Sequence, residues 1–383
     1  MKLGILAAAL MGITLATGSA MAQTKPVIGA LIRNLDDQFL NDYTANLKKA
    51  AASKGAELKI MDAHSDMATQ LDQLNTLVSQ GVKYFVVVPA VTEGSEQLAS
   101  IIAAKNGGAA FSNTAPTVTA LKSSSNFFLA SSPESIAGSI QADIVDSYFK
   151  KFPQKLGPGK AINLILFLGQ LGHPAQIYRT QAVLKDLEKK GYKVNVVAKD
   201  TANWQPDEAQ QKMDAWLNAY KGKFNLILAN NDAMALGAVE SLITAKYVDD
   251  PANPTKDVDG DGTFLKVPVI GVDATQVALR SMSENKLYAT VLQDAAAQAT
   301  TAFELAYTMA TKGAVNGATI NGIRPLDKAI EEAPANDPAL VKQIYLVPFK
   351  GVTKENLSSM DDLPVPLRPI KPTRSLDSRE KSA

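Results

Sequence analysis

Polar side chains recur along this 383-residue chain directly after short apolar runs that are typical of buried strands. Carboxylates, carboxamides and an arginine around one space can satisfy a ring of hydroxyl groups, each of which both donates and accepts a hydrogen bond. Phe39 and Trp204 add aromatic rings that can cover the apolar faces of a pyranose. Helix capping accounts for Asp36 or Asn230 alone, but not for the whole set with its aromatic neighbours. The polar residues are Asp36, Asp37, Gln38, Asn113, His173, Arg179, Asn230, Asn231, Asp232 and Asp273.

Catalysis has little support in the same residues. His173 has the chemistry of a general base, and Asp37 with Asp273 could form a carboxylate pair of the glycosidase kind. No nucleophile elbow, zinc motif or phosphate loop accompanies them, and the 157–159 segment Gly-Pro-Gly indicates a turn. The chain has no cysteine, which removes thiol catalysis, disulfides and sulfur-ligated metals. We therefore expect a binding protein, not an enzyme, with no required cofactor.

An acidic loop at 257–263 has the pattern of the first half of a calcium site. Oxygen ligands at positions 1, 3 and 5, glycine at position 6 and a backbone carbonyl at position 7 match the motif. Position 12 is Pro268, so the bidentate glutamate is missing, and Asp249 or Asp250 could complete the site if the segment folds back. A solvated acidic turn is the alternative, because Asp and Gly dominate turns. The candidate calcium ligands are Asp257, Asp259, Asp261 and Thr263.

Apolar, β-branched runs alternate with amphipathic runs of helical period in two successive sets. This alternation predicts an α/β fold made of two doubly wound parallel-sheet lobes. Ligands of such sheets bind beyond the carboxyl ends of the strands, where the polar residues stand. The first set has strands at 26–32, 57–61, 84–88 and from 109, with helices at 39–54, 67–80 and 93–104. The second has strands at 162–168, 192–198, 226–229 and 267–272, with helices at 177–190, 207–220, 233–243 and 275–284.

The two ends of the chain have their own composition. Residues 1–22 combine Lys2, an apolar run and an Ala-Met-Ala ending, which predicts a cleaved signal peptide and a periplasmic protein. Residues 361–383 are rich in proline and charge, which predicts a disordered tail. The net charge of +1 gives no reason to expect a nucleic acid as partner.

Several sequence blocks resemble the periplasmic galactose/glucose-binding protein family, of the ribose-binding-like type I class, over residues 26–357. The blocks are Asp36-Asp37-Gln38-Phe39, Gly172-His173-Pro174, residues 212–217 (Lys-Met-Asp-Ala-Trp-Leu), residues 229–235 (Ala-Asn-Asn-Asp-Ala-Met-Ala) and residues 271–274 (Gly-Val-Asp-Ala). Insertions lie near 247–266 and 323–340. The resemblance implies a type I periplasmic binding protein whose lobes close on a monosaccharide, glucose or galactose or a related hexose or glycoside.

Carried over to this chain, the family pattern implies a sugar site with six polar residues and two aromatic ones. The family's aspartate after the histidine is Ala175 here, which removes a buried acceptor, and its asparagine after the Thr-Val-Leu strand is Gln293. The family's calcium loop is replaced by residues without acidic side chains at 156–160. The implied ligand-binding residues are Asp37, Phe39, Asn113, His173, Arg179, Trp204, Asn231 and Asp273, with Gln293 in the changed position.

The resemblance also implies how the lobes are connected and which proteins recognise them. We expect an N-terminal lobe of 23–132 with 293–325, and a C-terminal lobe of 133–292 with 326–360. A three-segment hinge then crosses near 131–132, 293–294 and 322–326. The expected partners of this monomer are the sugar, a membrane ABC permease and a chemoreceptor. A chemotaxis or signalling protein for a pentose or furanosyl autoinducer is the alternative, and a repressor is disfavoured by the export signal.

Overall fold

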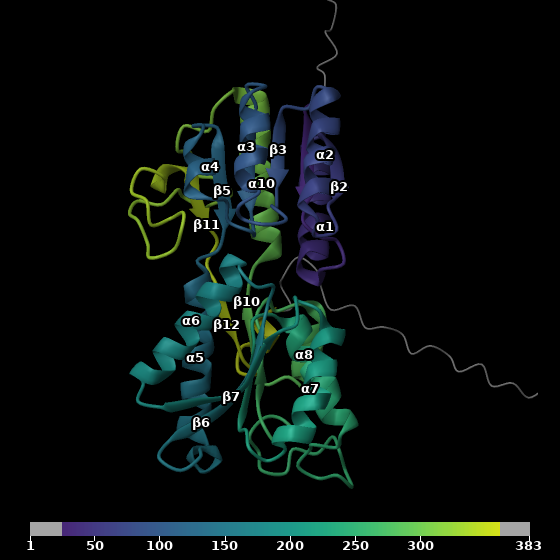
Figure 1. The fold of residues 1–383 in the computed structure, drawn as a ribbon, viewed down its shortest axis with the longest axis vertical. Helices are drawn as coiled ribbons and strands as arrows, with labels where there is room; N and C mark the ends of the chain where they lie inside the picture. Colours follow the sequence, from purple (N-terminus) through teal and green to yellow (C-terminus); the bar gives the residue numbers. More distant parts are fainter. Residues whose placement is uncertain (1–24, 361–383) are drawn as a thin grey trace, which may run out of the picture.

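The computed structural model describes residues 25–360, so the predicted signal peptide and C-terminal tail lie outside the described residues. Figure 1 shows two stacked lobes, with α1, α2, α3 and α10 in the upper one and α5, α6, α7 and α8 in the lower one. Between residues 25 and 360, none of the helices combines the length and the apolar character needed to cross a bilayer.

The first lobe is a six-stranded parallel sheet in the order β2-β1-β3-β4-β5-β11. Its strands are β1 (Val27–Ile32), β2 (Glu57–Asp62), β3 (Tyr84–Val87), β4 (Gly108–Ser112), β5 (Phe127–Ser131) and β11 (Ile344–Leu346). Its helices are α1 (Gln38–Ser53), α2 (Met67–Ser79), α3 (Ser95–Ala103), α4 (Val118–Lys122) and α10 (Ala295–Lys312). Helices α1 and α10 pack on one face through a core around Tyr43 and Phe303, and α2, α3 and α4 pack on the other.

The second lobe repeats this design. Its parallel strands are ordered β7-β6-β8-β9, and the antiparallel pair β10-β12 continues the sheet through parallel bridges to the β9 segment. The strands are β6 (Ala161–Leu168), β7 (Lys193–Thr201), β8 (Leu226–Ala229), β9 (Val269–Ile270), β10 (Thr290–Leu292) and β12 (Lys350–Val352). The helices are α5 (Glu134–Lys151), α6 (Pro174–Lys189), α7 (Pro206–Tyr220), α8 (Asp232–Thr244) and α9 (Gln276–Ser283). The short 3-10 turns η1 (Pro153–Lys155) and η3 (Leu357–Met360) also belong to this lobe, while η2 (Val341–Gln343) directly precedes β11 in the first. Strand for strand, both lobes have the same order, so the predicted pair of doubly wound α/β lobes is confirmed.

The chain crosses between the lobes three times. It passes from β5 to α5 at 131–134, from β10 to α10 at 292–295, and from β11 to β12 at 346–350. The predicted third crossing near 322–326 is wrong, because β11 pairs in parallel with β5 in the first sheet (Ile344 with Leu129). Residues 326–346 therefore belong to the first lobe rather than to the second.

The segment 327–340 is an excursion from the first lobe that contacts the second. It is the loop on the left of the upper lobe in Figure 1. The Glu332 carboxylate, 6% exposed, accepts hydrogen bonds from the backbone N–H groups of Glu134 (2.8 Å) and Ser135 (2.6 Å). Because these are free N–H groups at the start of α5, a carboxylate there is favourably placed. The Ala333 N–H also donates to the hydroxyl of Tyr178 on α6 (3.0 Å), so the loop holds the lobes together beside the hinge.

Candidate functional site

One pocket between the lobes is lined by all nine residues predicted to bind ligand. Two further residues, Arg33 and Ala175, complete its wall. Almost every lining residue stands just beyond the carboxyl end of a strand or in the first turns of the next helix, where doubly wound sheets bind ligands. The lining residues are Arg33, Asp37, Phe39 and Asn113 from the first lobe, His173, Ala175, Arg179, Trp204, Asn231 and Asp273 from the second, and Gln293 at a crossing.

Three of these side chains cap the helices that carry or follow them. Asp37 Oδ1 accepts from the Leu40 N–H (3.1 Å), and Asn231 Oδ1 accepts from the Met234 N–H (3.0 Å). His173 Nδ1 accepts from the Ala175 N–H (3.1 Å) at the start of α6. Capping fixes the position of each side chain before any ligand arrives. The same residues therefore both cap helices and line the pocket, although the sequence analysis treated these two roles as alternatives.

The hydrogen bonds of His173 fix how its protons are placed. Nδ1 accepts a hydrogen bond, so the ring proton lies on Nε2, which is 3.1 Å from Thr114 Oγ1 in the other lobe. Burial, with the charges of Arg33 and Arg179, holds the pKa of His173 well below its ordinary value. The imidazole is therefore neutral at pH 7, and its Nε2–H donates to Thr114 in the other lobe.

Arg179 joins the pocket to all three connections between the lobes. Its Nε donates to Glu134 Oε2 (2.7 Å) after the first crossing, and Nη2 donates to Gln293 Oε1 (2.9 Å) at the second. The guanidinium carbon lies 5.6 Å from the centre of the Phe349 ring at the third. Nη1 donates to the Asn230 carbonyl (2.6 Å). A ligand in contact with Arg179 thus touches the point where the hinge segments meet.

Asp273 and Gln293 form the wall nearest to the hinge. The Asp273 carboxylate is 3.8 Å from Arg179 Nη1, and burial raises its pKa well above the ordinary value. Gln293 Oε1 accepts a hydrogen bond from Arg179, while Gln293 Nε2 is buried and has no hydrogen-bond partner among the described residues. Arg33 Nε and Trp204 Nε1 are buried and unpartnered in the same way. Unpaired buried donors are costly in a finished protein, so three of them around one pocket point to a ligand rich in acceptors.

Arg33 was missed by sequence analysis, although it directly follows β1. It donates from Nη2 to Asp37 Oδ2 (2.7 Å) and is 4% exposed. The rule that residues just after a strand are informative would have found it. Its charge balances that of Asp37, whereas Arg179 has two carboxylates beside it, Glu134 at 2.7 Å and Asp273 at 3.8 Å.

The aromatic residues depend on a close approach of the backbone. The His173 and Trp204 rings meet edge to face with centroids 5.3 Å apart, and Phe39 stacks on Tyr43 behind it. A Cβ atom built on Gly169 would lie 2.0 to 2.2 Å from the Cη2, Cζ2 and Cζ3 atoms of Trp204. The indole can hold this position only because residue 169 is glycine.

We expect Gly169→Ala to displace the Trp204 indole and to weaken ligand binding at least ten-fold, about 1.4 kcal/mol. Isothermal titration calorimetry of this variant beside Leu171→Ala, an exposed residue of the same segment, measures the effect. Equal affinities for the two variants would show that Trp204 does not contact the ligand.

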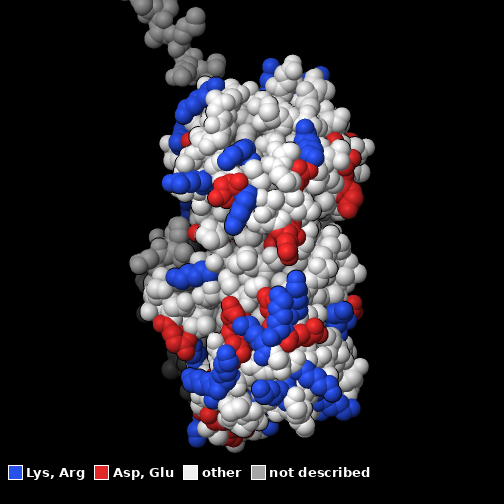
Figure 2. Space-filling view, turned by 90° about the vertical axis from the view of Figure 1, so that its left-hand side faces the viewer, with Lys and Arg blue, Asp and Glu red and all other residues white. Residues whose placement is uncertain are grey.

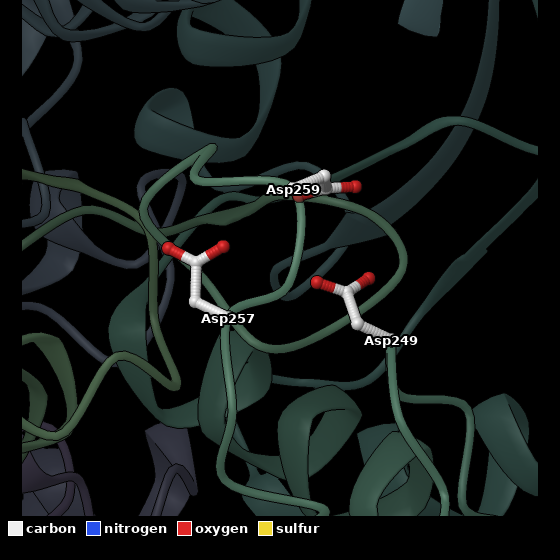
Figure 3. Close-up of side chains that lie close together, drawn as sticks. All are labelled: Asp249, Asp257 and Asp259. Atoms are coloured by element: carbon white, nitrogen blue, oxygen red, sulfur yellow. The ribbon is translucent and has the colours of Figure 1, made fainter.

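The acidic loop forms a carboxylate cluster that differs from the predicted one. Asp249, Asp257 and Asp259 place oxygen atoms within 4.8 Å of one another, and Figure 3 shows Asp249 and Asp257 pointing toward the segment that carries Asp259. Asp261 turns inward and accepts from the Tyr148 hydroxyl (2.6 Å). The Lys155 ammonium lies 2.6 Å from Asp259 and 2.9 Å from Asp261, so a lysine already supplies positive charge there.

Calcium binding at this loop stays a prediction, and Thr263, fully buried, is not part of the three-carboxylate cluster. Calorimetric titration of chelator-stripped protein tests it, since calcium at a hundred times its Kd would raise the free energy of unfolding by about 2.7 kcal/mol. Asp249→Asn should remove the effect and Asp250→Asn should keep it. No heat of binding and no change in Tm would make the loop a solvated turn held by Lys155.

Comparison with known proteins agrees with this architecture. The model of the periplasmic binding protein domain matches residues 28–314. A D-galactose/methyl-galactoside binding periplasmic protein of Haemophilus influenzae is 28% identical over 360 residues, covering 93% of this chain and 98% of that protein. A xylitol-binding protein of Mycolicibacterium smegmatis is 25% identical over 87% of this chain and 86% of that protein.

Solved structures give the same picture. An ABC transporter solute binding protein from Bacillus halodurans, with bound myo-inositol, superposes with a TM-score of 0.68 at 26% identity, over 88% of this chain and 97% of that one. The family match, the relatives and the fold place this chain among periplasmic binding proteins. The chain therefore belongs to the periplasmic binding protein family, within its type I sugar-binding class.

Proposed function

We propose that this protein captures a neutral monosaccharide between its lobes and delivers it to an ABC permease. The observation that carries the proposal is the buried inter-lobe pocket with its balanced charges. Its wall holds two arginines and two aspartates, one such pair in each lobe, and the histidine is neutral. A charged ligand would upset this balance in a site of low dielectric, whereas a polyol or sugar would not.

The contacts of the pocket favour hinge closure as the mechanism. The lining residues are all buried, so a ligand reaches them only when the lobes separate. The His173–Thr114 contact and the bonds of Glu332 exist only with the lobes together. A ligand held by both walls favours the closed state by its differential affinity for that state. The permease, and a chemoreceptor if one reads this protein, would recognise the closed surface of a monomer.

Glucose, galactose or a related hexose or glycoside is the ligand we favour. The relative from Haemophilus influenzae is described as binding galactose and methyl-galactoside, while the others are described with xylitol or myo-inositol. Ala175 lines the pocket with a methyl group, which leaves room and removes an acceptor at one end of the sugar. A pentose or furanose in a signalling role is the second candidate.

Surface charge gives no support to a polyanionic partner. Figure 2 shows basic and acidic side chains interspersed over both lobes on the face it draws, and the chain carries a net charge of only +1. Nor does the pocket favour catalysis, because both ring nitrogens of His173 are engaged by Ala175 and Thr114. Turnover of a chromogenic glycoside by purified protein would contradict the binding function.

A thermal-shift screen of hexoses, pentoses and their methyl glycosides, together with inositols, tests the proposal. At a hundred times its Kd, a true ligand would add about 2.7 kcal/mol to the free energy of unfolding and raise Tm by several degrees. Mass spectrometry of sugar carried through purification provides an independent identification. A screen in which no neutral sugar shifts Tm, although the protein is folded, would refute the proposal.

A further inference from the structure

The excursion at 327–340 is anchored firmly in the first lobe. Ala335 and Leu340 are buried in the core that α3 and α4 cover, with exposed fractions of 3% and 1%. The Asp337 carboxylate lies 2.5 Å from the ammonium of Lys122, the last residue of α4. An arm held by both apolar packing and an ion pair has little freedom of its own, so the excursion moves with the first lobe.

The tip of this arm caps a helix of the second lobe. A helix begins with N–H groups that lack partners, and the N-cap side chain normally accepts from one of them. Helix α5 has no such cap, because Pro133 at its N-cap position makes no side-chain hydrogen bond. The Glu332 carboxylate takes this role, accepting from the N–H groups of Glu134 (2.8 Å) and Ser135 (2.6 Å) and from the Ser135 hydroxyl. The cap of α5 therefore comes from the other lobe.

Both contacts of the tip are made with neighbours of Arg179, the arginine of the sugar pocket. Glu134, whose N–H binds Glu332, holds Arg179 Nε with its own carboxylate (2.7 Å). Tyr178, whose hydroxyl accepts from the Ala333 N–H (3.0 Å), directly precedes Arg179 in α6. Neither Glu332 nor Ala333 lines the pocket. The arm is thus one residue away from a pocket side chain without being able to contact the ligand itself.

We propose that Glu332 is a positioning residue which, with Ala333, latches the closed state and so sets the affinity for every ligand by the same factor. The inference rests on the proposed sugar-binding function. Opening carries the first lobe away from α5 and α6, which breaks the bonds of the latch, so the latch makes opening more costly. A ligand leaves only from the open state, and dissociation is therefore slowed. Because the latch touches no ligand atom, its effect is independent of which sugar is bound.

The test combines calorimetric titration with stopped-flow dissociation, followed by the fluorescence of Trp204 in the pocket wall. The probes are D-galactose, D-glucose, xylitol and myo-inositol. For each probe that binds the wild type, Glu332→Ala should raise Kd about ten-fold, mainly through faster dissociation. Glu332→Gln keeps one acceptor oxygen and should lie between the two. Glu331→Ala, at the exposed carboxylate next to the latch, is the matched control and should bind like the wild type.

A helix cap that takes no part in closure would behave differently. Glu332→Ala would then lower Tm but leave Kd and the dissociation rate unchanged, and this result would overturn the inference. A loss of affinity that differed from probe to probe would overturn it as well, because Glu332 would then act on the shape of the pocket. Tyr178→Phe removes only the second contact of the latch, so it should give a smaller uniform loss even if Glu332→Ala fails to fold. Absence of binding by every probe to the wild type would instead refute the sugar-binding function, on which the latch depends.

Discussion

Arg179→Met is expected to abolish sugar binding and to lower the free energy of unfolding by about 3–5 kcal/mol, because it leaves a buried carboxylate without its cation. Arg179 is 2% exposed and its partner Glu134 is 4% exposed, with 2.7 Å between them. The change also frees the Gln293 oxygen and the Asn230 carbonyl. Thermal and denaturant melts measure the loss of stability, and calorimetry measures the loss of binding.

A double variant separates the two effects. Glu134→Gln combined with Arg179→Met removes the stranded charge, so it should recover part of the stability without recovering sugar binding. Arg280→Met, at an exposed arginine of α9, is the matched control and should change neither. Wild-type affinity in the single variant would show that Arg179 does not contact the sugar. Wild-type stability would show that the buried Glu134 carboxylate does not depend on Arg179 for its counter-charge.

Asp273→Asn is expected to act in opposite directions on stability and on binding. Burial raises the pKa of Asp273, so at neutral pH the folded protein holds a carboxylate that is ionised more easily in the unfolded chain. The resulting loss of stability is absent below about pH 4, the ordinary pKa, and grows as the pH rises toward the folded-state pKa. Asparagine cannot ionise, so the variant should melt above the wild type at pH 7.

Sugar affinity should fall in the same variant by about ten- to hundred-fold, because a hydrogen bond to a charged group contributes about 1.5–3 kcal/mol. Asparagine also suits the backbone here, since residue 273 has φ of 126°, which bulkier residues adopt poorly. Melts at pH 4 and pH 8 supply the control: the difference in Tm between variant and wild type should be small at the lower pH. A difference independent of pH would mean that the carboxyl of Asp273 is not the source.

The strands that could be predicted closely are those buried on both faces. Residues 226–229 form β8 at the bounds expected, because a fully apolar run between polar ends leaves no choice of register. The β11 strand could not be found, since it has three residues and takes its identity from pairing with β5, more than two hundred residues earlier. The insertion before it also hid the fact that the chain had returned to the first lobe. Tertiary pairing, not local pattern, decides such an edge strand.

The residues that line the pocket could be predicted, but the contacts that join them to the hinge could not. Parallel strands end at the same edge, so residues following them had to converge, and the nine predicted ones do line one pocket. Their contact with a sugar stays a prediction. The sequence contained no sign that Arg179 would join three hinge segments, because Glu134, Gln293 and Phe349 lie far apart along the chain. Likewise, Asp261 turns away from the acidic cluster toward Tyr148, 113 residues distant, a partner that the loop motif does not reveal.

The number of crossings has a practical consequence. Three is odd, so the described chain begins in one lobe, at β1, and ends in the other, where Leu357 packs against the second core. Two dyes attached near residues 25 and 359 would therefore lie on different lobes. The efficiency of energy transfer between them would then report the separation of the lobes directly. Because the chain has no cysteine of its own, only the two introduced thiols would react with the dyes. Motion of the lobes could therefore be followed without altering the pocket.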